Sequence, residues 1–295
     1  GGGSSSNPPT QVTIPNTAPT FQSDKSFELL EGTIDVGTIE VSDSNLADTL
    51  SLEISGGSDE SFFELGACNT SRCTSNSLVF TSKPDFENAS DSDGDNRYEL
   101  TLSAFDGTAT TTQDISIVVL DAFEGRVVDA PISGASVFID LNGNDELDDE
   151  EPSGTTDEEG FFAVDTFTLP ETGGAKVISK GGTDTKTGAA LPNLALISDV
   201  PADITKPANV TPLTTVIASV ETAEEKAKVL TAMGIDKSPE ELLTTDNWEA
   251  AESGDEAAKA TQRVNQQIGL LLQTASTVVD DGDEATDVSV AVAES

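Results

Sequence analysis

Hydrophobic and polar residues alternate in short segments between Thr20 and Asp121, and turns rich in Gly, Asn, Asp and Ser separate these segments. A period of two is typical of strands that bury one face. The clearest segments are residues 27–30, 50–54, 77–80, 98–102 and 115–120. Several such strands within about 100 residues predict an antiparallel β-sandwich over residues 18–121.

A second series of apolar segments follows, and these segments are again short and separated by turn residues. They lie near residues 125–128, 135–139, 161–164, 176–178 and 194–197. The length of these segments predicts strands rather than helices. We therefore expect a second β-sandwich, in tandem with the first, over residues 122–203.

The period changes after residue 203. Leu213, Val216, Ile217 and Val220 have the spacing of one helix face, and Pro212 can open that helix. Further helices are predicted at residues 223–233, after the Ser238 capping box, and at 255–279. Residues 204–295 thus predict a small helical bundle with a C-terminal tail. The expected fold class is mainly β, with two tandem antiparallel β-sandwiches and an α-helical C-terminal module.

The first 17 residues are rich in Gly, Ser and Pro and predict a flexible tether. They resemble the segment that follows the lipidated cysteine of a bacterial lipoprotein, although that cysteine is not in the sequence. An engineered linker or a processed signal-peptide remnant is the alternative. No apolar run approaches the roughly 20 residues of a membrane-spanning helix. We therefore expect membrane contact only through an N-terminal lipid anchor.

Acidic residues dominate the charge of the chain, with 54 Asp and Glu against 14 Lys and Arg and a net charge of −40. This surplus repels nucleic acid and anionic lipid, so neither is an expected partner. Bound divalent cations would relieve the repulsion. A salt-adapted acidic surface is the other explanation of the same composition.

Several classes of catalysis are excluded because the chain has no histidine. Ser-His-Asp and Cys-His nucleophiles, His-ligated zinc and imidazole acid–base chemistry all require that residue. A single Trp and a single Tyr also argue against an aromatic platform for carbohydrate binding. We therefore expect no enzymatic activity.

The two cysteines, Cys68 and Cys73, lie five positions apart in a turn-rich segment. This spacing suits a disulfide that pins a hairpin, whereas redox catalysis more often uses two cysteines separated by two residues. A disulfide implies an oxidising compartment, so the expected location is extracellular.

An acidic cluster begins at Asp85 and Glu87 and continues at Asp91, Asp93 and Asp95, with no basic residue between them. Calcium is bound by six to eight oxygen atoms at about 2.3–2.6 Å, and closely spaced carboxylates around a glycine can supply them. The cluster predicts a calcium site. A solvated acidic loop is the alternative.

A second cluster has the spacing of an EF-hand loop. The residues at loop positions 1, 3, 5, 9 and 12 are Asp140, Asn142, Asn144, Asp148 and Glu151. Glu146 would offer its carbonyl oxygen at position 7. Position 6 carries Asp145 instead of the usual glycine, and the preceding segment is a predicted strand. The sequence therefore predicts calcium in a loop that is not part of a helix–loop–helix sensor.

Residues 16–121 resemble the cadherin-like domains of bacterial surface proteins. Asn16 to Phe21 match their N-x-A-P-x-F opening, although residues 121–124 depart from the usual D-x-N-D-N linker. The resemblance implies calcium ligands at the matching positions Glu31, Asp43, Asn45, Asp85, Glu87, Asp106 and Asp121.

The second cluster and the following Thr156-Asp157-Glu158-Glu159-Gly160-Phe161-Phe162 resemble the SdrD B-like and CNA-B-like modules of bacterial adhesins, including RTX-type adhesins. In that family the ion has a structural role and fastens a loop. Both resemblances imply a calcium-binding, non-enzymatic structural or adhesion protein of the bacterial outer cell surface. The expected partners are other surface or matrix proteins, or copies of the same chain. The alternatives are a subunit of a homopolymeric filament joined through its termini and, more remotely, an accessory module of a carbohydrate-active enzyme.

Overall fold

A computed structural model describes residues 15–68, 70–170 and 174–278. The expected tether at residues 1–17 and the expected tail fall largely outside these ranges. The chain divides into two compact units, Gly1–Leu120 and Asp121–Ser295. The mainly β fold with helices towards the C-terminus is confirmed.

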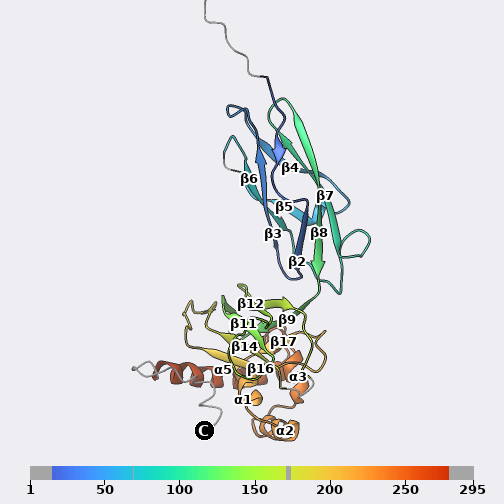
Figure 1. Ribbon diagram of the computed structural model, residues 1–295. Helices are drawn as coiled ribbons and strands as arrows, with labels where there is room; N and C mark the ends of the chain where they lie inside the picture. The colour runs from blue at the N-terminus through green and yellow to red at the C-terminus, as the bar shows by residue number, and fades with distance from the viewer. Residues whose placement is uncertain (1–14, 69, 171–173, 279–295) are drawn as a thin grey trace, which may run out of the picture. The chain divides into compact units, whose positions relative to one another are not determined.

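The first unit is a sandwich of two four-stranded sheets (Figure 1). The sheets have the orders β1-β3-β6-β5 and β2-β8-β7-β4, and all pairings are antiparallel except β2 with β8. A 3-10 helix, η1 (Glu60–Phe62), precedes β5. The strands are β1 (Thr20–Phe21), β2 (Ser26–Leu30), β3 (Asp35–Ser42), β4 (Ser51–Gly56), β5 (Phe63–Leu65), β6 (Ser75–Phe80), β7 (Arg97–Phe105) and β8 (Thr110–Leu120).

The core of this unit follows from the alternation of the strands. In β8, Ile115, Ile117 and Val119 are buried while the residues between them are more exposed. Tyr98 of β7 is 1% exposed and packs edge-on against Phe80 at 5.0 Å between ring centroids. The acidic residues lie in the segments that connect these strands.

The second unit contains three sheets, with the orders β12-β11-β14-β16, β13-β9-β17 and β10-β15. The β9–β17 pairing is parallel, and the others are antiparallel. The strands are β9 (Ala122–Val127), β10 (Ile132–Ser133), β11 (Ser136–Asp140), β12 (Ser153–Thr155), β13 (Phe161–Asp165), β14 (Lys176–Lys180), β15 (Thr183–Asp184), β16 (Ala195–Asp199) and β17 (Ala208–Val210).

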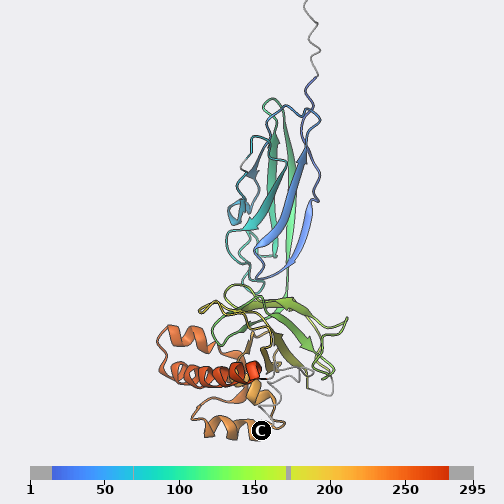
Figure 2. The same cartoon turned by 90° about the vertical axis from the view of Figure 1, so that its left-hand side faces the viewer.

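The five helices of the described residues lie to one side of these strands (Figures 1 and 2). Thr211 and Ser238 open α1 and α3 with capping boxes, and the box at Ser238 was predicted. None of the described helices is both long and apolar enough to cross a membrane. The helices are α1 (Pro212–Ala218), α2 (Ala223–Ala232), α3 (Pro239–Thr244), α4 (Asn247–Glu252) and α5 (Glu256–Val278).

The helices share a core with the second set of strands. Leu272 of α5 belongs to the same buried cluster as Phe123 of β9 and Val210 of β17. Residues on both sides of the boundary expected near 203 therefore form one compact unit.

Candidate metal sites

The first carboxylate cluster consists of Glu31, Asp85 and Glu87, whose side chains each offer an oxygen within 4.8 Å of the others. Glu31 directly follows β2 and is 2% exposed, and its Oε2 accepts a hydrogen bond from the N–H of Phe86 at 2.7 Å. Asp85 and Glu87 are exposed. The structure thus brings together three residues that the sequence predicted as ligands, from segments more than 50 positions apart.

The second cluster consists of Asp43, Asp48 and Asp106, again with oxygens within 4.8 Å of one another. Asp43 follows β3 and is 8% exposed. Its Oδ1 accepts a hydrogen bond from the N–H of Asn45 at 2.6 Å. Its Oδ2 is buried and has no hydrogen-bond partner among the described residues. Asp48 was not predicted from the sequence, because no motif marks it.

Asp106 lies in the turn after β7 and is held as a carboxylate. Its Oδ1 accepts hydrogen bonds from the N–H groups of Ala109 at 2.6 Å and Thr108 at 2.7 Å, and its Oδ2 accepts one from the Asn16 side-chain amide at 2.8 Å. The Ala109 N–H, together with Asn16 and Thr108, holds the pKa of Asp106 below its usual value. The charged form that a metal requires is therefore favoured.

Asn45 lies beside this cluster but is engaged in other hydrogen bonds. Its Oδ1 accepts from the N–H of Thr17 at 2.9 Å, and its Nδ2 donates to the carbonyl of Pro15 at 3.1 Å. These contacts attach the segment before β1 to the loop after β3.

The third cluster consists of Asp91, Asp93 and Asp95. Asp91 is 7% exposed, and its carboxylate accepts hydrogen bonds from the N–H groups of Gly94, Asp95 and Asn96. Burial raises the pKa of Asp91, but these hydrogen bonds outweigh it and the net shift is downward. Asp93 is exposed, and a hydrogen bond with Asp91 and the charge of Asp95 raise its pKa.

Asp59, another residue without a sequence motif, lies next to this third cluster. It is 1% exposed and accepts hydrogen bonds from the N–H groups of Ser92 at 2.7 Å and Glu99 at 2.8 Å. Burial acts to raise its pKa, but the bonds from Glu99, Ser58 and Ser92 lower it overall. Asp59 therefore anchors the acidic loop as a buried carboxylate.

The loop of residues 140–151 in the second unit is organised around Asp140, which is completely buried. Its carboxylate accepts hydrogen bonds from the N–H groups of Asn142 at 3.2 Å, Gly143 at 2.7 Å and Asp145 at 3.0 Å. Asp145 has a φ of 59°, the left-handed conformation that glycine supplies at this position of an EF-hand loop. The loop therefore curls tightly although the expected glycine is missing.

Two other predicted ligands of this loop donate to one carboxylate oxygen of a third, Asp148. The side-chain amides of Asn142 and Asn144 donate to Asp148 Oδ2 at 2.5 and 2.8 Å. Glu151 lies nearby and accepts hydrogen bonds from the N–H groups of Leu141 at 2.8 Å and Asp148 at 3.1 Å.

In the contacts described, the side chains of two predicted ligands do not join any of these clusters. Glu146 is exposed, and its N–H donates to Asn144 Oδ1 at 2.8 Å. Asp121 is exposed at the start of the second unit. Calcium binding by either residue stays a prediction.

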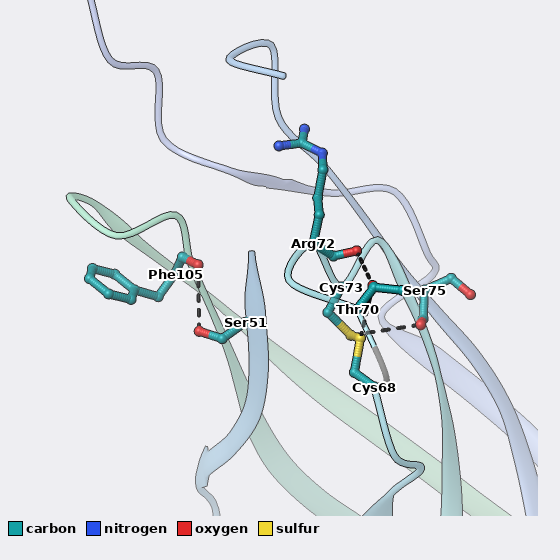
Figure 3. Close-up of a disulfide and its surroundings, with 7 residues drawn as sticks. All are labelled: Ser51, Cys68, Thr70, Arg72, Cys73, Ser75 and Phe105. Carbon is teal, nitrogen blue, oxygen red and sulfur yellow. Dashed lines mark hydrogen bonds between the residues drawn. A yellow bond between two sulfur atoms is a disulfide. The ribbon is translucent and has the colours of Figure 1, made fainter. Parts of the chain in front are cut away.

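The predicted disulfide between Cys68 and Cys73 is confirmed, with 5.8 Å between the Cα atoms (Figure 3). It closes a turn in which Thr70 Oγ1 donates to the carbonyl of Arg72 at 2.8 Å. Disulfides persist in oxidising environments, so the bond fits an extracellular protein.

No protein-family model matches the chain, and no curated protein matches it. The solved structures that match this chain include the following three. Human protocadherin-24 EC1-2 is 15% identical, with a TM-score of 0.28, and the match covers 62% of this chain and 95% of that one. The sialic acid binding region of a Streptococcus sanguinis adhesin is 14% identical, with a TM-score of 0.28 and coverage of 40% and 34%. An endo-fucoidan hydrolase of glycoside hydrolase family 107 is 17% identical, with a TM-score of 0.25 and coverage of 39% and 18%.

The chemistry of the clusters suits a hard divalent cation. Carboxylate and carbonyl oxygens are the ligands that calcium prefers, and the clusters supply oxygens without His or Cys. The buried Asp43 Oδ2 gives the clearest fit, because a buried carboxylate oxygen without a hydrogen bond is costly unless a cation satisfies it.

Proposed function

We propose that this chain is a calcium-binding structural or adhesion protein of the bacterial cell surface. The observation that supports this most strongly is the buried Asp43 Oδ2, which has no hydrogen-bond partner among the described residues and lies beside the carboxylates of Asp48 and Asp106. Three carboxylates this close repel one another, and a divalent cation would convert that repulsion into attraction.

The residues of this cluster connect parts of the first unit that are distant in sequence. Asp43 and Asp48 belong to the segment between β3 and β4, Asp106 follows β7, and Asn16 joins the segment before β1 to Asp106. Calcium would supply positive charge and oxygen coordination there. The consequence is one rigid end of the sandwich, in which strand ends and the incoming chain are held together.

The loop of residues 140–151 would fasten the second unit in the same way. The amide nitrogens of Asn142 and Asn144 face the carboxylate of Asp148, and Asp140 shapes the loop that presents these side chains. Calcium at this loop would have a structural role, as the resemblance to SdrD B-like and CNA-B-like modules implies. The cadherin-like resemblance supports the same role for the first unit.

The surroundings of such a protein would be extracellular, as the disulfide also suggests. Its partners would be surface or matrix proteins or further copies of the chain. The function would involve no catalysis.

Calcium binding to the full chain, measured by isothermal titration calorimetry, tests the proposal. The wild-type protein should bind calcium, and Asp43→Asn should lose at least one site. Asp114→Asn is the matched control, because Asp114 is an exposed carboxylate on β8 outside the three clusters. Absence of binding to the wild type, or equal binding by Asp43→Asn, would refute the proposal.

A further inference from the structure

One guanidinium group holds the loop that carries the Asp43 cluster. Arg72 Nη2 donates to the carbonyl of Asp43 at 2.8 Å, and Nη1 donates to the carbonyls of Asn45 at 3.1 Å and Asp48 at 2.9 Å. The loop between Asp43 and Asp48 therefore has its backbone fixed at both ends and near its middle by one side chain.

These three hydrogen bonds involve main-chain oxygens rather than the carboxylates. The carboxylate oxygens of Asp43, Asp48 and Asp106 lie within 4.8 Å of one another, and Asp43 Oδ2 has no hydrogen-bond partner in the described ranges. Arg72 thus organises the loop without using the oxygens that would bind a cation. Its own positive charge opposes cation binding, so the order that its three hydrogen bonds give the loop must outweigh that repulsion for Arg72 to strengthen binding.

Arg72 is itself held in position by the turn that the disulfide closes. The N–H of Leu50 donates to the carbonyl of Ser71 at 3.1 Å, and the N–H of Cys73 donates to the carbonyl of Leu50 at 3.0 Å. The Cys68–Cys73 bond closes the turn around Arg72, and the Arg72 side chain extends away from the sulfur atoms (Figure 3). Cys73 is buried whereas Cys68 is exposed, so the bond ties an exposed segment to a buried residue two positions before β6.

We propose that the Cys68–Cys73 disulfide and Arg72 are positioning elements that set the calcium affinity of the Asp43, Asp48 and Asp106 cluster. This inference rests on the proposed function. It adds that the thiol–disulfide state of Cys68 and Cys73 regulates calcium binding at this cluster. Groups that orient metal ligands from outside the coordination sphere typically change metal affinity by about 10–100-fold when removed. A loss of about tenfold is expected when either element is removed.

Thermodynamic linkage requires the reverse effect as well. If the disulfide strengthens calcium binding, calcium must stabilise the disulfide against reduction by the same factor. Reduction by a dithiol transfers two electrons: one reductant thiolate attacks a cysteine sulfur and the other cysteine leaves as a thiolate. The second reductant thiol then displaces the first cysteine, which leaves two cysteine thiols and a cyclic disulfide of the reductant.

Calcium titrations of the full chain, followed by amide NMR, separate the sites. The N–H groups of Thr108 and Ala109 donate to Asp106 and report the Asp43 cluster, whereas the N–H of Phe86 donates to Glu31 and reports the Glu31 cluster. Arg72→Met and the double variant Cys68→Ser/Cys73→Ser should each weaken calcium binding at the Asp43 cluster about tenfold, as measured from the Thr108 and Ala109 N–H signals. The titration at Phe86 should not change. Arg97→Met is the control, because Arg97 is exposed and donates to Ser116 Oγ.

A second measurement does not depend on the folding of a variant. The wild-type disulfide is equilibrated with dithiothreitol in calcium and in chelator. Half-reduction should require about ten times more dithiothreitol, relative to its oxidised form, in calcium. Equal midpoints, or unchanged affinity at Thr108 and Ala109 in both variants, would overturn the inference while leaving the proposed function in place. If calcium does not shift the amide signals of Thr108 and Ala109 in the wild type, both the proposed site and this inference are wrong.

Discussion

The carboxyl group of Asp129 lies directly against the main chain of Gly269 in α5. A Cβ atom at position 269 would overlap that carboxyl group, so glycine permits the contact. Gln273 Nε2 donates to Asp129 Oδ2 at 3.2 Å, and Gln262 Nε2 donates to its carbonyl at 3.1 Å. The loop after β9 and helix α5 are thus joined around a half-buried carboxyl group.

This arrangement predicts a pH dependence of the second unit. Burial, together with the charge of Asp184, raises the pKa of Asp129 to about 6. The folded state therefore holds this proton more tightly than the unfolded chain. The resulting stability is fully present below about pH 4, the unfolded pKa, and is lost as the pH rises through about 6.

Asp129→Asn removes this titration. The variant should be more stable than the wild type at pH 8, by on the order of 2 kcal/mol, and should show no gain at pH 4. Urea unfolding of the second unit at both pH values measures the difference. Asp165→Asn, at an exposed position of β13, should show no such pH-dependent gain. A difference from the wild type that is the same at both pH values would contradict the assignment.

Removal of the Asp246 carboxylate should strongly destabilise the second unit. Asp246 Oδ2 binds Arg126 Nη1 at 2.8 Å, and Oδ1 accepts from the N–H groups of Trp248 and Glu249 at the start of α4. Because Arg126 is 9% exposed, Asp246→Ala leaves a buried charge unpaired and removes a helix cap. The expected loss is about 3 kcal/mol or more by urea unfolding. Glu224→Ala, which breaks an exposed ion pair with Lys228, should cost less than about 1 kcal/mol.

Two carboxylates of the loop at residues 140–151 should respond differently to substitution. Asp140→Ala removes the acceptor of three buried or partly buried N–H groups and should lower the melting temperature in calcium and in chelator alike. Asp148 is exposed and accepts only side-chain amides in the contacts described, so Asp148→Asn should lower the melting temperature in calcium and have little effect in chelator. Equal responses of Asp148→Asn in both conditions would indicate that this loop does not bind the ion.

Local patterns were sufficient to predict most strands and four of the five helices in the described residues. Helix α4 was missed because its six residues show no apolar repeat, and its Asp246 cap is held by Arg126, which lies 120 positions away. The short strand β17 was missed as well, because three residues are too few for a period and its pairing with β9 is parallel.

In the candidate sites, too, local motifs predicted some residues, whereas others could be identified only in the folded chain. Asp85 and Glu87 were identified because they stand close together in a recognisable motif. The resemblance also marked Asp43 and Asp106 as separate ligand positions, and only the folded chain brings those two together. Asp48, Asp59 and Arg72 carry no local signal, because only the folded chain brings them to the clusters. Calcium itself remains a prediction that rests on these carboxylates.

The central claim is that calcium stabilises both units, and calorimetric unfolding of the full chain in calcium, magnesium and chelator tests it most directly. A ligand that binds only the native state contributes about 2.7 kcal/mol per site at a hundredfold excess over Kd. Calcium should therefore raise the unfolding temperature of each unit by at least about 5 °C relative to chelator, and magnesium should do so less. Identical unfolding temperatures in calcium and chelator for both units would contradict the account.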